Sequence, residues 1–149
     1  MPKKAEKVIR GFEVIKPFRE CVITYLESYH ALSRAYESFA NIDGTKNSWC
    51  ERVVSKAAIE RHLFMIEDAL GQLPEKYRNP VMYTFAGEAL STVRIDIELE
   101  MGMDYGDVIV FREKLIYFVA KNLGFPVSEK GEEWEIEVQS DGEIIVVSE

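Results

Sequence analysis

The chain has 149 residues, of which 47% are hydrophobic and 30% charged, so one packed domain is expected and overall disorder is excluded. No apolar run approaches the ~20 residues that a membrane-spanning helix needs. No apolar stretch that would make a signal peptide follows the basic N-terminus, so we expect a cytoplasmic protein with no membrane partner. Cys21 and Cys50 lack metal-ligand spacing and are expected to be reduced.

The charge is distributed unevenly along the chain. The formal net charge is −8, which argues against simple nucleic-acid binding. Residues 1–80 contain 13 Lys and Arg against 11 Asp and Glu, whereas residues 81–149 contain 5 against 15. Eight of those acids follow residue 128, where Lys130 is the one cation. An acidic tail can therefore hide a neutral or weakly basic body.

The N-terminal half predicts two long helices. A short mixed segment runs to Lys16, and apolar residues then recur at steps of three or four from Phe18 to about Ala40, which indicates one amphipathic helix. Polar residues 41–48 are typical of a loop. A second helical pattern runs from Val53 to Leu70 and ends near Gly71.

Three shorter helices are expected next. One lies near residues 75–85, with a kink or boundary at Pro80. Ser91 or Thr92 is a suitable N-cap for a helix from Val93 to about Met101. Asp104 can cap the last helix, which is expected to stop near Leu123, before a glycine and a proline.

The tail changes to alternating apolar and polar residues. Trp134, Ile136 and Val138 alternate with polar residues, and Asp141-Gly142 is a signal for a tight turn before a second apolar run. We therefore predict a mainly α fold, a helical bundle with a C-terminal helix-turn-helix and a short C-terminal β-hairpin. The expected parts are an N-terminal arm and long helix (1–43), a sigma-like helix-turn-helix domain (44–128) and an acidic β-hairpin tail (129–149).

The segment from Ile97 to Val108 has the spacing of a helix-turn-helix. Ile97 and Met101 are expected to share a helical face, and Gly102 falls where a left-handed residue is needed. Met103 would fill the corner, Asp104 would cap the second helix, and Val108 would pack back. A pair of packed core helices explains the same pattern about equally well.

Segments on both sides of this motif resemble a known family. They are the stretch from Gly44 to Leu70, the run Leu73-Pro74-Glu75-Lys76-Tyr77-Arg78, and the segments Phe111–Leu115 and Val119–Gly124. Together they resemble the ArpU/RinA-type late-gene regulators of Gram-positive phages, which are similar to the promoter-reading domain of sigma factors. The chain departs from that pattern at Glu98, where a small residue is usual, and at Asp104 and Asp107, where Ser or Thr is usual.

The resemblance implies a transcriptional regulator that binds double-stranded DNA, with the last helix in the major groove. Arg112 would read guanine, Tyr105 would touch a phosphate or a thymine methyl, and Asp107 could accept from a cytosine amino group. Lys114 is a further expected groove contact. Basic residues expected to border the groove or contact phosphate are Lys76, Arg78 and Arg94.

The last helix is apolar on several faces, so it should be buried or form an interface, and a homodimer or another protein partner is expected. A second hypothesis is therefore a protein-interaction module on a degenerate helix-turn-helix scaffold, binding RNA polymerase, a phage packaging protein or its own copy. A third is a small-terminase-like packaging protein. His30 and His62 have no partners at ligand spacing, so we expect no metal, no cofactor and no enzyme activity.

Overall fold

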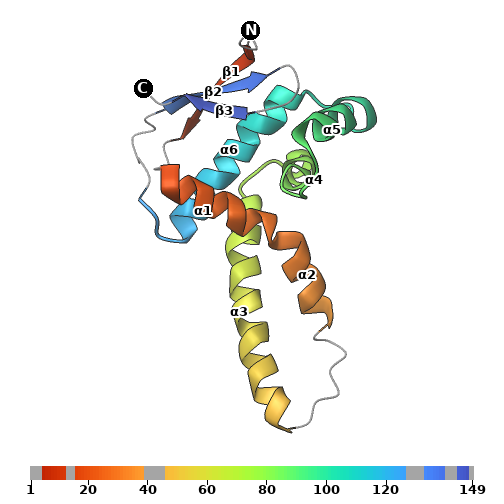
Figure 1. Ribbon diagram of the computed structural model, residues 1–149, viewed down its shortest axis with the longest axis vertical. Helices are drawn as coiled ribbons and strands as arrows, with labels where there is room; N and C mark the ends of the chain where they lie inside the picture. Colours follow the sequence, from red (N-terminus) through yellow and green to blue (C-terminus); the bar gives the residue numbers. More distant parts are fainter. Residues whose placement is uncertain (1–4, 13–15, 39–45, 127–132, 140–143, 148–149) are drawn as a thin grey trace.

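The computed structural model describes residues 5–12, 16–38, 46–126, 133–139 and 144–147, and these are mainly helical. Figure 1 shows α6 in the middle of the body, α1 crossing it, and α2 and α3 extending away together as an arm. The elements in chain order are β1 (Ala5–Phe12), α1 (Lys16–Glu27), α2 (Tyr29–Ser38), α3 (Lys46–Leu70), α4 (Glu75–Tyr83), α5 (Leu90–Ile95), the π-helix η2 (Asp96–Glu100), α6 (Tyr105–Asn122), β2 (Glu133–Gln139) and β3 (Ile144–Val147).

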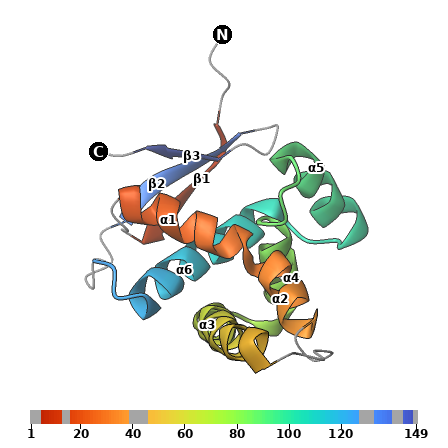
Figure 2. The ribbon, with the colours of Figure 1, turned by 60° about the horizontal axis from the view of Figure 1, so that its bottom comes forward.

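Helix α6 is the centre of the core. It packs against α1, α3, α4 and β1, so it is covered on several sides (Figure 2). Val108, Ile109, Leu115, Ile116 and Val119 are all buried along it. Each such side chain stabilises the fold by about 1.5–3 kcal/mol when it leaves water. The sequence predicted that this helix is either buried or at an interface, and in the structure the chain's own segments bury it.

The first predicted helix is divided in two. Residues 18–40 were expected to form one helix, but α1 ends at Glu27 and α2 begins at Tyr29. Ser28 lies between them, and its Oγ donates to Tyr25 O at 2.6 Å. A serine hydroxyl that bonds back to a preceding carbonyl competes with the helical ladder and bends it.

The next two boundaries lie close to the predicted ones. Helix α3 already includes Asn47 and Ser48, which were predicted to be loop, whereas residues 41–45 of that loop lie outside the described residues. It ends at Leu70, as predicted. Pro80 lies inside α4, and the helix continues to Tyr83, since a missing N–H removes only one hydrogen bond of the ladder.

The predicted cap of α5 is wrong. The helix begins at Leu90, its N-cap is Ala89 without a side-chain hydrogen bond, and Ser91 and Thr92 lie inside the first turn. The cap of α6 is confirmed, because Asp104 Oδ2 accepts from the backbone N–H of Asp107 at 3.0 Å. This bond satisfies one of the amides that a helix leaves unpaired at its start.

A three-stranded antiparallel sheet of order β1-β2-β3 lies against α6. Its register places Val8 opposite Glu137 and Ile136 opposite Val146. The segments predicted as the two tail strands pair with each other, and the turn expected at residues 140–142 lies outside the described residues. Strand β1 was not predicted. It brings residues 5–12, near the N-terminus, into one sheet with the two strands of the acidic tail.

His62 holds the junction of α1, α2 and α3 together. Its ring stacks on Tyr25 with centroids 3.3 Å apart. Its Nε2 lies 3.2 Å from Tyr25 O and 3.1 Å from Ser28 Oγ, and Tyr25 Oη donates to His62 O at 3.1 Å. Burial lowers the pKa of His62, and the hydrogen bond to Tyr25 O opposes that shift.

This junction predicts a loss of stability in mild acid. Because the pKa of His62 is lowered in the folded chain, the unfolded chain takes up a proton first as the pH falls below about 6.5. The His62 contribution to the free energy of unfolding should be complete above that pH and decrease below it. Urea unfolding at about pH 7.5 and about pH 5.5 should show a larger loss for the wild type than for His62→Gln. Equal losses in the two proteins would contradict this role.

Candidate functional site

Two of the predicted groove contacts on α6 are in the core, which corrects those predictions. Tyr105 is 1% exposed and Arg112 is 6% exposed. A side chain that reads bases must reach the base edges in the groove. In this fold Tyr105 and Arg112 cannot, because the protein itself surrounds them.

The polar groups of Arg112 are bonded inside the protein. Its Nε donates to Thr84 Oγ1 at 3.1 Å, its guanidinium lies 4.5 Å from the ring centre of Phe85, and one terminal nitrogen lies 3.4 Å from Glu113 Oε1. Burial lowers the pKa of Arg112, and the charge of Glu113 opposes that shift. Arg112 therefore acts as a structural cation between α4 and α6.

A second arginine uses the same carboxylate. A terminal nitrogen of Arg19 on α1 donates to Glu113 Oε1 at 2.6 Å, and Glu113 is buried. Arg19 Nε is the one buried side-chain polar atom without a hydrogen-bond partner in the part of the chain that the structure describes. This Arg19–Glu113–Arg112 cluster fastens α1 across α6, over the helix that was expected to enter DNA.

The remaining predicted contacts on α5 and α6 do not converge on one basic face. Asp107 is exposed, Lys114 is half-buried with its Nζ 5.0 Å from the ring centre of Phe111, and Arg94 donates from Nε to Glu98 Oε1 at 2.5 Å. The structure therefore leaves a carboxylate, not a cation, exposed on the first turn of α6.

The two predicted phosphate contacts lie on α4. Lys76 is exposed, with its Nζ 5.0 Å from the ring centre of Tyr77. Arg78 donates from Nε to Leu73 O at 3.1 Å and from a terminal nitrogen to Gly71 O at 3.2 Å. Its guanidinium caps the carbonyls that follow α3, which explains its half-buried position.

The π-helix η2 turns apolar side chains outward. Met101 N bonds to Asp96 O at 3.1 Å, a spacing of five residues, so positions four apart no longer share a face. Ile97 is buried while Met101 is 40% exposed, which corrects the expectation that they pack together. Leu99 is 79% exposed and Ile95 is also exposed. Gly102, as predicted, has a left-handed backbone with φ +64°.

Met101 lines two hollows along α4. The first, of about 360 Å³, lies between α2, the end of α3 and α4. The second is about 700 Å³ and lies between α4 and the turn before α6. Asn79 and Met101 line both hollows, so the two are adjacent, and we call them together the Met101 groove.

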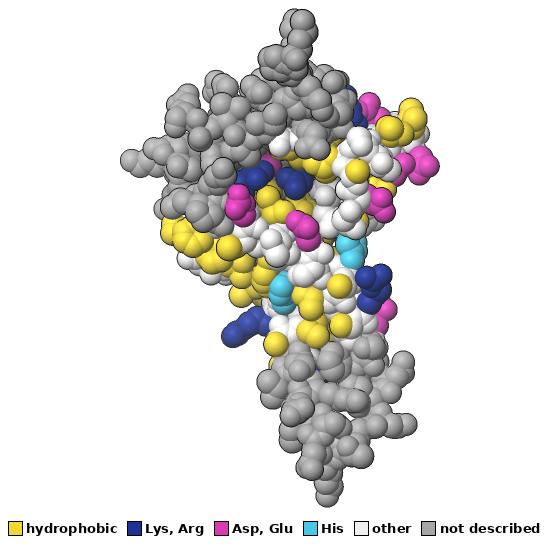
Figure 3. Space-filling model, in the orientation of Figure 1, with side chains coloured by type: hydrophobic (Ala, Val, Ile, Leu, Met, Phe, Trp, Pro, Cys, Tyr) yellow, Lys and Arg dark blue, Asp and Glu magenta, His cyan; other side chains and the backbone are white. Residues whose placement is uncertain are grey.

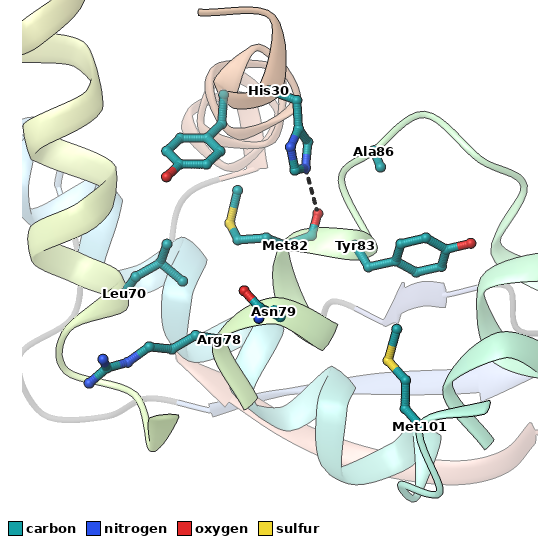
Figure 4. Close-up of a pocket in the computed structure, with 9 residues that line it drawn as sticks. His30, Leu70, Arg78, Asn79, Met82, Tyr83, Ala86 and Met101 are labelled. Atoms are coloured by element: carbon teal, nitrogen blue, oxygen red, sulfur yellow. Dashed lines mark hydrogen bonds between the residues drawn. The ribbon is translucent and has the colours of Figure 1, made fainter. Parts of the chain in front are cut away.

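The wall of the first hollow is mostly apolar, whereas Lys76, Asn79 and Asp104 contribute polar groups to the second. Figure 4 shows Met82 in the middle of the first hollow, with Leu70 on one side and Met101 pointing toward Tyr83. His30 Nε2 lies 3.5 Å from Met82 O at its upper edge. An apolar lining with a few polar groups is the usual composition of a binding surface.

A hydrogen bond between Tyr83 and Asp96 fixes one side of the groove. Tyr83 Oη donates to Asp96 Oδ2 at 2.5 Å, which ties η2 to α4. This bond is the main cause that raises the pKa of Tyr83 to about 12, with desolvation and nearby carboxylates adding to it. The neutral phenol therefore persists at all physiological pH values, and the contact does not depend on pH there.

Carboxylates surround this side of the surface. In Figure 3 hydrophobic side chains at the upper right, over α5, are bordered by acidic ones. The sequence from residue 88 to residue 107 has one cation, Arg94, and six acids, which are Glu88, Asp96, Glu98, Glu100, Asp104 and Asp107. The groove was not predicted from the sequence, although Leu99 among these acids was a signal for it.

Among the described residues, no group of three His, Cys, Asp or Glu side chains is placed to hold a metal ion. Across the same residues, no helix has both the length and the apolar composition to cross a bilayer. Comparison with protein families, characterised proteins and solved structures finds no match for the chain, so the resemblance to the ArpU/RinA-type regulators stays a prediction.

The Arg19–Glu113–Arg112 cluster predicts a large effect of one substitution. Glu113→Ala leaves two buried guanidinium groups without their carboxylate, so the free energy of unfolding should fall by about 3–5 kcal/mol in urea denaturation. The matched control is Glu20→Ala, which removes an exposed carboxylate from α1 and should change stability by less than about 0.5 kcal/mol. A loss below about 1 kcal/mol for Glu113→Ala would show that the cluster does not hold α1 on α6.

Proposed function

We propose that this protein is a protein-interaction module built on a degenerate helix-turn-helix scaffold, and that the Met101 groove is its binding surface. The scaffold is α5 with η2, the turn through Gly102, and α6. The observation that carries the proposal is the burial of α6, the helix that a DNA-binding relative would place in the major groove.

Burial of α6 disfavours DNA binding through this helix. Exposing Arg112 would require α1 to leave α6, because Arg19 on α1 and Arg112 share the buried carboxylate of Glu113. Tyr105 is also buried, with the guanidinium of Arg94 over its ring. The exposed groups nearest the start of α6 are also acidic, and carboxylates repel the phosphate backbone. Both effects favour the interaction module over the regulator of phage late genes and over a small-terminase-like protein.

The Met101 groove supports binding to a protein. Isolated exposed apolar residues are ordinary, but Ile95, Leu99 and Met101 lie within one short segment, and Met101 lines both hollows. A methionine at the centre suits such a surface, since its flexible side chain adapts to a partner. RNA polymerase, a phage packaging protein and a second copy of the chain are candidate partners.

The proposal predicts which peptides the protein selects. A random-peptide display selection on the full chain should enrich sequences that no longer bind the double variant Leu99→Asp, Met101→Asp, since both changes place a charge on the apolar surface. As a control, Phe64→Asp places a charge at an exposed apolar residue of α3, and this variant should still bind the peptides. Enriched peptides that bind all three proteins equally would mean that the groove is not the binding surface.

Duplex DNA gives the opposing test. In a fluorescence anisotropy titration at low and moderate salt, the full chain should show no saturable binding to labelled duplex. Tight binding that weakens steeply with salt would overturn the proposal and restore the regulator hypothesis, with α6 leaving the core on DNA.

A further inference from the structure

We propose that the occupant of the Met101 groove is a basic amphipathic helix of a partner protein, an inference that rests on the proposed function. Three features of the groove point to this class of ligand: walls made of helices, two hollows that share one methionine, and an acidic edge.

The helical walls favour a helical ligand. The groove lies between the first turn of α2, the end of α3, α4 and the turn before α6, and those helices use their own backbone groups internally. An extended peptide would bring N–H and C=O groups over an apolar lining that offers no strand edge. A helix satisfies its own backbone groups, so it can enter such a lining without that cost.

The two hollows indicate two apolar anchors. Met101 lines both of them, and Leu70 and Met82 add apolar surface to the first. A volume of about 360 Å³ is ample for one large aliphatic or aromatic side chain. Apolar side chains spaced by one or two helical turns on one face would fill both hollows.

The acidic edge determines the charge of the partner. Glu88 and Glu100 are exposed on the α5–η2 side, and their charges are close enough to Tyr83, which lines the first hollow, to help raise its pKa. Glu98 on the same side is paired with Arg94, and the opposite side is lined by Lys76, Arg78 and Asp104. The α5–η2 side of the groove is therefore its negative side, and a helix with Lys or Arg along that border matches it. A second copy is a poorer match, because the chain carries a net charge of −8.

The test uses the full chain with ¹³C-methyl methionine and three synthetic peptides of equal length with the same two leucine anchors. One peptide carries lysine at its polar positions, one carries glutamate, and the third is the lysine peptide with a central proline that breaks its helix. Assignment of the Met101 methyl signal comes from Met101→Leu. The lysine peptide should shift the signal of Met101 and leave that of Met65, on α3 away from the groove, unchanged.

We expect the lysine peptide to bind most tightly. The affinities of the glutamate and proline peptides should be lower by about tenfold or more. The double variant Glu88→Gln, Glu100→Gln should weaken the lysine peptide and its salt dependence, whereas Glu20→Gln on α1 should not. Equal or tighter binding of the glutamate peptide at Met101 would overturn the charge argument alone. Equal binding of the proline peptide would overturn the helical ligand. If none of the peptides shifts Met101, this inference fails, and the display selection then decides separately whether the proposed function fails with it.

Discussion

The fold depends on the need to cover α6. This helix presents apolar side chains in nearly every direction, and Val108, Ile109, Leu115 and Val119 are all excluded from water. Such a helix is stable only when other elements surround it. Helices α1, α3 and α4 and strand β1 all pack on it, and the Arg19–Glu113–Arg112 cluster fixes one of them in place.

Covering α6 also decides what the rest of the surface can do. Because α6 is packed inside the protein, it does not enter a DNA groove beside α5 and η2, the first helix of the predicted motif. The outer side of α5 and η2 can therefore present other groups. The π-helix η2 turns Leu99 and Met101 outward there, while the bond from Tyr83 to Asp96 holds this segment against α4. The burial of α6 and the exposure of apolar side chains on η2, which precedes it, thus result from the same packing. Both underlie the proposed binding surface.

Local signals in the sequence were sufficient for several features. Gly102 was predicted to be left-handed and Asp104 to cap α6, because each depends on one residue and its immediate neighbours. Signals that depend on distant residues failed. Arg112 was expected to read guanine from the helix that would enter the major groove, but its buried cluster includes Arg19, far away in the sequence. Strand β1 was missed because its pairing partner lies at the other end of the chain.

The break at Ser28 and the start of α5 have smaller causes. A serine hydroxyl bonded to Tyr25 O is enough to divide a helix whose apolar pattern is continuous. At α5, the helix begins at Leu90, so the better cap residues Ser91 and Thr92 lie inside its first turn. In both places competing effects differ by about 1 kcal/mol, which a pattern of residue types does not resolve.

Amide hydrogen exchange followed by mass spectrometry tests the central claim, that α6 is a core helix and not a surface for DNA. We expect peptides covering residues 108–120 to exchange last, at the rate of global unfolding, and peptides from α2, which packs mainly on α3, to exchange much earlier. Exchange of α6 as fast as that of α2 would contradict a core position for α6, because it would show that α1 and the sheet leave the helix readily in solution.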